Sequence, residues 1–544
     1  MYVDALEQET TSDFFKEVFT RTDFVNLAQV SRIFPQFSAP RLYPEYVLQF
    51  QSGLMVPITF ERLLRPDNPG RKEVRRLRVV QIDSSAHEMA IPWGTTGSHF
   101  RAAPRQFCEL ACTMVLSVLR QLDYNTLQEF TWDLPIPLSP TIQFYLEAHQ
   151  PNLEILKVQH SLDLSHGQPD IPLLPRMNNL TQLSLSPRLN HTLNPQVAAL
   201  LRESSRIHTL EFDQCEYHHN VHHAFEEYDA PKPDHTRSVW IELERMHRTE
   251  LKESERYILG NFTGDQVDEL IRSNFSALHT LHLREFSVCN LCSVIPMENL
   301  RTLTLIDPPD IYDLFNCWEP EERRLQTFTL VIRSLTRGED ILTLMTAIED
   351  FLLSFTGLHS LRFINEMAHR CIRSQREPVL RTNVLANHCE SLETLVLASR
   401  GREGGSKTVY PLPLDRLLEY TTQLPRMKRL GVPVGYETLE SSIDLLGQVA
   451  PNVEWLAVAN HREHKWKMKA MEEFAFKVWK AAGVEGRLKV LVLGGEVKYK
   501  PHYFLVQTGD DGEKEIKFVG TETKGREAVE KAVGGGDGVD NVIW

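Results

Sequence analysis

The chain is poor in cysteine, in long apolar runs and in net positive charge. Its 8 cysteines among 544 residues are too few for a disulfide framework and favour a reducing compartment. No run of about 20 apolar residues occurs, so the sequence predicts no membrane-spanning helix. The formal net charge of −14 lacks the basic footprint of a protein that binds nucleic acid or an anionic membrane.

Recognisable catalytic motifs are also missing. The sequence has no phosphate-binding glycine loop with a lysine, no Gly-x-Ser-x-Gly elbow and no His-Glu-x-x-His pair. Acidic residues such as Asp4, Glu7 and Asp13 interrupt the first residues, so no signal-peptide pattern occurs there. We therefore expect a non-enzymatic protein of the cytoplasm or nucleus, without catalytic residues, cofactor or metal.

The sequence does contain a repeated apolar pattern, Leu-x-x-Leu-x-Leu. The stretch 389–397 shows it, with apolar anchors at Leu392, Leu395 and Leu397. Similar triplets start at Val74, Leu127, Leu153, Leu180, Ile207, Leu278, Leu300, Leu325, Leu358, Met427, Val453 and Leu488. The last two anchors of each triplet lie two residues apart, which is the periodicity of a β-strand.

Amphipathic segments follow many triplets and predict helices. Examples are residues 194–204, 339–355 and 414–423. One strand with one helix cannot bury its apolar face, whereas stacked copies share a continuous core. Over roughly residues 70–495 the chain resembles a leucine-rich-repeat protein. The resemblance implies an α/β solenoid with a curved parallel sheet inside and helices outside; a helical repeat array of another type is the alternative.

A second pattern lies near the start of the chain. The run from Asp23 to Phe34 contains Leu-x-x-Val-Ser-Arg-x-Phe, and Val18 and Phe19 form an apolar pair before it. This run resembles the distal part of an F-box, although residues 2–12 do not provide the usual Leu-Pro start. Residues 39–43, Ala-Pro-Arg-Leu-Tyr, resemble the link from F-box to repeats in fungal F-box/leucine-rich-repeat proteins.

This resemblance implies a partner for the N-terminal residues, namely a Skp-type adaptor of a cullin–RING ubiquitin ligase. The implied adaptor-binding residues are Phe15, Val18, Phe19, Leu27, Val30 and Phe34. Such short helices present an apolar surface that is too small to bury alone. The chain would then be a substrate-recognition subunit whose repeats hold an unknown target protein. The alternative is a leucine-rich-repeat scaffold without a ligase link, in which these helices only cap the solenoid.

These patterns divide the chain into three predicted regions. Residues 1–50 form the F-box-like helical segment, residues 51–495 the solenoid, and residues 496–544 a C-terminal cap with a flexible tail. Within the cap, residues 503–507 and 514–519 predict a hairpin, and residues 525–533 predict a helix. An insert near residues 215–262 holds the histidine run 218–223, for which a polar loop is favoured over a zinc site. Residues 239–241 in this insert are candidates for a further strand.

The residue between the last two anchors should lie on the opposite face of the sheet from the anchors. In the earlier repeats this residue is polar, and in the later ones it is small or apolar. The predicted partner-binding face comprises Arg362, Val396, Trp455, Ala457, Val490 and Val492. Its apolar end is either an exposed protein-binding patch or a surface covered by residues 496–520.

Three smaller motifs carry weaker signals. The basic run 71–78 predicts solvated charges at a strand edge rather than a phosphate or acidic-peptide site. Cys289-x-x-Cys292 has no second cysteine pair, so thiols in the core are favoured over zinc or redox chemistry. The glycine-rich run 400–407 follows a repeat strand without phosphate-loop spacing, and we expect a flexible loop there.

Overall fold

The structure is a computed structural model that divides the chain into two compact units, Met1–Ala277 and Leu278–Trp544. It describes residues 44–51, 69–82, 103–134, 138–158, 177–185, 194–213, 240–241, 243–246, 274–288, 290–319, 323–333, 340–368, 371, 380–403, 406–410, 412, 414–434, 443, 453–460, 468–483, 486–494, 501–508 and 514–533. The predicted adaptor-binding residues, the histidine run and the Cys289 position lie outside these residues.

The described residues of the first unit form six parallel strands that neighbour one another in chain order. They are β1 (Glu45–Gln51), β2 (Arg76–Ile82), β3 (Glu129–Asp133), β4 (Ile155–Val158), β5 (Gln182–Leu185) and β6 (Thr209–Asp213). The connections contain the 3-10 helix η1 (Pro69–Glu73) and the helices α5 (Ala103–Leu119), α6 (Pro140–His149) and α7 (Asn194–Glu203).

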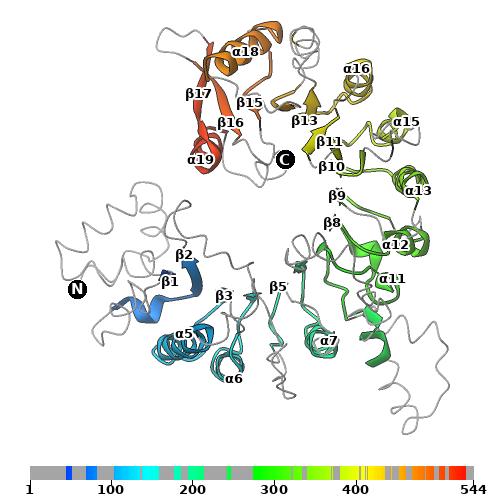
Figure 1. Ribbon diagram of the computed structural model, residues 1–544. Helices are drawn as coiled ribbons and strands as arrows, with labels where there is room; N and C mark the ends of the chain where they lie inside the picture. The colour runs from blue at the N-terminus through cyan, green and yellow to red at the C-terminus, as the bar shows by residue number, and fades with distance from the viewer. Residues whose placement is uncertain are drawn as a thin grey trace, which may run out of the picture. The chain divides into compact units, whose positions relative to one another are not determined.

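The second unit continues the same principle. Its parallel strands are β7 (Thr280–Arg284), β8 (Thr302–Ile306), β9 (Thr327–Ile332), β10 (Ser360–Asn365), β11 (Thr394–Glu403), β13 (Arg429–Val434), β14 (Trp455–Asn460) and β15 (Val490–Leu493). Between them lie α11 (Leu291–Val294), η3 (Met297–Asn299), α12 (Ile311–Cys317), α13 (Ile341–Leu353), α15 (Thr382–Ala386), α16 (Leu414–Gln423) and α18 (Met468–Ala481). Figure 1 shows α12, α13, α15 and α16 along one side of these strands.

The repeated anchors explain this arrangement. Each strand pairs so that anchor faces anchor, for example Leu281 with Leu303 and Leu361 with Leu395. The first anchors, which precede the strands, are buried as well; Leu358 and Leu392 are fully buried. Because the anchors point toward the helices, they form the core between helices and sheet. The α/β class is therefore confirmed, and the mostly parallel sheet in each unit is consistent with a repeat solenoid.

The C-terminal residues form the predicted hairpin and helix. Strand β16 (His502–Thr508) pairs antiparallel with β15, and β17 (Lys514–Thr521) pairs antiparallel with β16. Helix α19 (Glu522–Val533) follows directly and lies beside β16 and β17 (Figure 1). The hairpin prediction is confirmed, and its first strand extends the repeat sheet.

The structure also contains elements that the pattern did not predict. Strand β1 crosses the predicted boundary at residue 50 and pairs with β2, placing Tyr46 opposite the anchor Leu77. The anchor pattern missed this strand because a tyrosine stands where other strands carry an aliphatic or phenylalanine side chain. In the insert, Trp240 and Ile241 are helical rather than extended. Trp240 is fully buried, with its ring 5.9 Å from that of Phe212, so this part of the insert packs against β6.

Residues 400–403 and 406–407 of the glycine-rich run pair as strands, so the prediction of a flexible loop was wrong for them. Strand β11 continues to Glu403 and pairs antiparallel with β12 (Ser406–Val409). Arg400 lies opposite Val409 in this ladder. Backbone pairing outweighs the weak strand propensity of glycine here, because propensity in strands depends strongly on context.

Candidate protein-binding face

The face of the second unit's sheet opposite the anchors carries side chains in regular rows. We call the part formed by β7 to β10 the open face. Its first row is Thr280, Thr302, Thr327 and Ser360, and its second row is His282, Thr304, Thr329 and Arg362. All eight side chains are partly exposed. Threonine suits such a position because its branched β-carbon favours a strand while its hydroxyl faces solvent.

A third row on the same face is apolar. Val331, Ile364 and Ala398 pack together at the carboxyl ends of β9, β10 and β11, and Ile306 packs against them from β8. Although they lie on the face without anchors, the three are only 3% to 6% exposed. This row therefore offers little apolar area to a partner.

Charged side chains border the apolar row. The Arg333 guanidinium lies 3.7 Å from the Glu285 carboxylate, and that of Arg400 lies 3.6 Å from Glu366. The backbone N–H of Arg333 also donates to Asp307 Oδ1 at 3.0 Å. Arg333 and Arg400 come two residues after members of the apolar row and so lie on the same face. Along the strand direction, the open face therefore carries first mainly hydroxyl groups, then the apolar row, and then ion pairs.

The apolar end of the predicted partner-binding face is buried. Trp455 is 4% exposed, Val492 is 2% exposed, and Val396, Ala457 and Val490 are fully buried. Of the six predicted residues, Arg362 alone is partly exposed. These apolar residues therefore belong to the core of the second unit.

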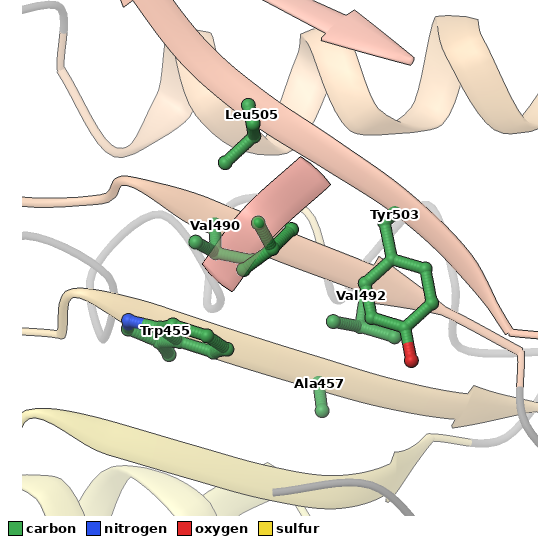
Figure 2. Close-up of a cluster of buried hydrophobic side chains, with 7 residues drawn as sticks. Trp455, Ala457, Val490, Val492, Tyr503 and Leu505 are labelled. Carbon is green, nitrogen blue, oxygen red and sulfur yellow. The ribbon is translucent and has the colours of Figure 1, made fainter. Parts of the chain in front are cut away.

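A cover from the C-terminal segment explains the burial of four of these residues, and Val396 lies outside this cover. We call the following residues the covered cluster: Trp455, Ala457, Val490, Val492, Tyr503, Leu505 and Val529. Figure 2 shows Trp455, Val490 and Leu505 on neighbouring strands, with Tyr503 beside Val492. The last member comes from α19, beyond the predicted covering range 496–520. The Arg429 guanidinium lies 5.5 Å from the centre of the Trp455 ring and borders the cluster on its other side.

A glycine allows the covering helix to approach. A Cβ atom added at Gly525 in α19 would overlap the Tyr503 ring and lie 2.6 Å from the backbone oxygen of Gly520. Gly520 itself has a φ of 146°, which a residue with a side chain rarely adopts. These two glycines therefore permit the tight turn from β17 into α19 and the seating of α19 on β16.

The sheet of the first unit has a different, charged face. Glu129 lies 3.7 Å from Arg76 and 3.3 Å from Lys157, while Arg78 lies 3.2 Å from Glu45. Two of the basic side chains in the run 71–78 are thus paired with acidic neighbours. Both basic side chains are solvent-exposed as predicted, but β2 is paired with β1 and β3 and is not an edge strand. Such partly exposed pairs contribute little stability, typically about 0–1 kcal/mol each.

A ladder of asparagines joins the turns before β3 to β6. The Asn152 backbone N–H donates to Asn125 Oδ1 at 2.8 Å, Asn179 Nδ2 donates to Asn152 Oδ1 at 3.0 Å, and Arg206 Nη1 donates to Asn179 Oδ1 at 3.0 Å. Successive members are 27 residues apart. They line a groove of about 440 Å³ together with Arg75 and Glu154. The repeat pattern did not predict this ladder, although the constant spacing of its members in the turns was a usable signal.

A buried histidine joins two repeats of the second unit. His388 is 1% exposed, and its Nε2 lies 3.0 Å from the Leu352 carbonyl at the end of α13. The neighbouring Asn387 donates to the carbonyls of Leu352, Leu353 and Phe355. These contacts satisfy helix-terminal carbonyls that lack a partner within the helix. Burial lowers the pKa of His388 from 6.5 to about 4, although its hydrogen bond to Leu352 acts in the opposite direction.

No helix among the described residues is long and apolar enough to cross a membrane. No group of three or more His, Cys, Asp or Glu side chains in the described part of the chain could hold a metal ion. Comparison with known proteins finds no matching family model and no similar curated sequence. The F-box resemblance therefore stays a prediction from the sequence motif, and the fold is consistent with a repeat solenoid.

Proposed function

We propose that the chain is a substrate-recognition subunit of an F-box-type cullin–RING ubiquitin ligase. The observation that carries this proposal is a Leu-x-x-Val-Ser-Arg-x-Phe run placed ahead of a repeat sheet that has a hydroxyl-lined open face. The N-terminal run supplies a motif for a Skp-type adaptor, and the open face supplies a surface for the target. Stacked repeats commonly use such extended faces for binding.

The chemistry of the open face indicates the kind of target surface that fits it. Threonine and serine hydroxyls both donate and accept hydrogen bonds, so the first two rows suit a polar protein surface. Arg362 adds a positive charge to the second row. Because the apolar row is nearly sealed, we expect few buried aromatic anchors in this complex and a modest affinity.

A leucine-rich-repeat scaffold without a ligase link is the second candidate, and one observation favours it. Strand β1 begins at Glu45, shortly after the F-box-like run in the sequence, and pairs with β2. Terminal caps are needed where a repeat array would otherwise expose its core. In this alternative the N-terminal residues serve only as that cap.

A binding assay with a defined adaptor separates the two candidates. Purified full-length chain is mixed with a Skp-type adaptor, alongside a double variant, Phe19→Asp with Val30→Asp, and a control variant, Thr329→Arg. We expect the parent and the control to bind the adaptor and the double variant to lose binding, because carboxylates would be placed in the apolar adaptor contact.

The outcomes can be told apart because the double variant changes the F-box-like segment, whereas the control variant changes the open face. Circular dichroism and urea denaturation of all three proteins would establish that the repeats remain folded. Failure of the folded parent to bind any Skp-type adaptor would refute the ligase proposal and leave the scaffold. Equal binding by the parent and the double variant would show that Phe19 and Val30 are not the adaptor contact.

A further inference from the structure

Two cysteines from neighbouring repeats lie side by side in the second unit. The sulfur atoms of Cys292 in α11 and Cys317 at the end of α12 are 2.7 Å apart. This separation is closer than two thiols reach in ordinary contact, although it is longer than a disulfide bond of about 2.05 Å. The two residues are 25 positions apart in the sequence. The pairing therefore depends on the stacking of repeats and not on the Cys-x-x-Cys motif.

The two thiols differ in their access to solvent. Cys292 is 5% exposed, which agrees with the expectation of a core thiol, whereas Cys317 is exposed. The sulfur of Cys317 lies 3.6 Å from the Leu314 carbonyl oxygen, and that of Cys292 lies 4.0 Å from the same oxygen. A reagent in solution can reach the Cys317 thiol directly, whereas it reaches the buried Cys292 thiol only after it has reacted with Cys317. This asymmetry matches an attacking and a resolving cysteine.

We propose that Cys292 and Cys317 form a reversible disulfide site that reacts with small disulfides such as oxidised glutathione. The Cys317 thiolate attacks one sulfur of the small disulfide, forms a mixed disulfide and releases one small thiolate. The Cys292 thiol then loses its proton and attacks the Cys317 sulfur, which releases the second small thiolate. Two protein thiols are oxidised, one small disulfide is reduced to two thiols, and the two protons leave with them.

The bond would join the outer sides of two repeats. Helix α11 lies between β7 and β8, and α12 lies between β8 and β9. A link from Cys292 to Cys317 would therefore close a loop around β8, the strand that carries Thr302 and Thr304 of the open face. Closing a loop restricts the unfolded chain, so oxidation should stabilise these repeats. This inference does not depend on the proposed ligase role.

The site is tested with the full-length chain in glutathione buffers of increasing oxidised fraction. Samples are quenched in acid, the remaining thiols are alkylated under denaturing conditions, and peptides are identified by mass spectrometry. We expect a Cys292–Cys317 linked peptide to appear in the parent as alkylation of these two residues is lost. Its appearance should be reversed by added reductant. A Cys389→Ser control should form the same link.

Single variants test the order of the two steps. Cys317→Ser should leave Cys292 reduced and free of glutathione, because the buried thiol is not attacked directly. Cys292→Ser should accumulate a mixed disulfide of glutathione with Cys317, because no resolving thiol remains. Full alkylation of both residues in the parent under every buffer would overturn the proposal, as would a link from either residue to another cysteine. Whether the Cys292–Cys317 link forms is measured on the parent chain, so poor folding of a variant does not affect that result.

Discussion

The open face and the covered cluster occupy equivalent positions of the same sheet and differ in what lies over them. In β7 to β10 the residues between the anchors are Thr304, Arg362 and similar polar groups, which remain partly exposed. In β14 and β15 the equivalent residues are Ala457 and Val492, which are buried together with Tyr503 and Val529. The repeat geometry is shared, so the side chains at these positions decide whether the face stays open or receives a cover.

This difference shows how the C-terminal end of the repeat sheet is covered. A parallel repeat sheet would expose a row of unpaired backbone groups at its last strand, which is an aggregation risk. Here β16 pairs with β15, β17 pairs with β16, and α19 returns over the adjoining face. The apolar residues of the last repeats are therefore part of a terminal core, whereas the polar residues of the earlier repeats remain available for binding.

Trp455→Ala should have the largest effect on this comparison. Removing the indole from the covered cluster leaves a cavity and deletes the contact with Arg429, which should cost about 3–5 kcal/mol of stability. We expect a lower urea midpoint and faster hydrogen exchange in β16 and α19. Phe144→Ala, which removes a large but exposed ring on α6, is the matched control. A loss below about 1 kcal/mol would show that the cluster is not a core.

Acidification should lower the stability of the two repeats that His388 joins. The pKa of folded His388 is about 4, below its ordinary value of 6.5, so the unfolded chain binds the proton first as the pH falls. The stabilisation is present above pH 6.5 and is lost as the pH falls to about 4, with a total of roughly 3 kcal/mol. Protonation would add an N–H at Nδ1, which has no hydrogen-bond partner in its buried site.

A pair of variants would isolate this titration. His388→Gln removes the ionisable ring, so the loss of stability between pH 6.5 and 4 should shrink, as measured by urea denaturation at each pH. His359→Gln changes an exposed histidine of the preceding repeat and should leave the loss unchanged. Identical pH curves for the parent and the His388 variant would contradict the prediction. As the pH is lowered, hydrogen exchange should accelerate in α13 at a higher pH than it does in α19.

Gly525→Ala should loosen the cover by a smaller amount. Alanine is a better helix former than glycine by about 1 kcal/mol, but overpacking against Tyr503 and Gly520 costs about 1–3 kcal/mol. We therefore expect a net loss of up to about 2 kcal/mol and easier proteolysis of α19. Lys524→Ala changes the neighbouring exposed residue of the same helix and should have little effect. A stabilised Gly525→Ala protein would mean that α19 does not sit against β16.

The smallest effect is expected on the open face itself. Thr329→Ala removes a partly exposed hydroxyl between two buried anchors and should change the free energy of unfolding by no more than about 0.5 kcal/mol. Urea denaturation of the parent and the variant would measure this difference. A loss above about 2 kcal/mol would show that the hydroxyl rows are structural, which would remove the contrast with the covered cluster.

The anchor pattern predicted most of the repeat strands because burial of every second residue is a local property of the chain. Leu395 and Leu397 are buried in β11 as the pattern requires. The prediction failed where a residue's role depends on distant partners. Tyr46 lies in a strand because β2 is available for pairing, and Gly401 lies in a hairpin because β12 returns beside it. Trp455 was equally compatible with an exposed patch and with a core until the position of α19 was known.

By itself the sequence determined the α/β class, the spacing of the repeat strands, the C-terminal hairpin and the polar or apolar character of each row. These features follow from periodicity and composition, which are local. The tertiary structure decided that Trp455 is covered, that Arg362 remains on an open face, that His388 is held neutral and that Cys292 meets Cys317. Each of these depends on contacts between residues far apart in the chain, and such contacts exist only after the repeats have stacked.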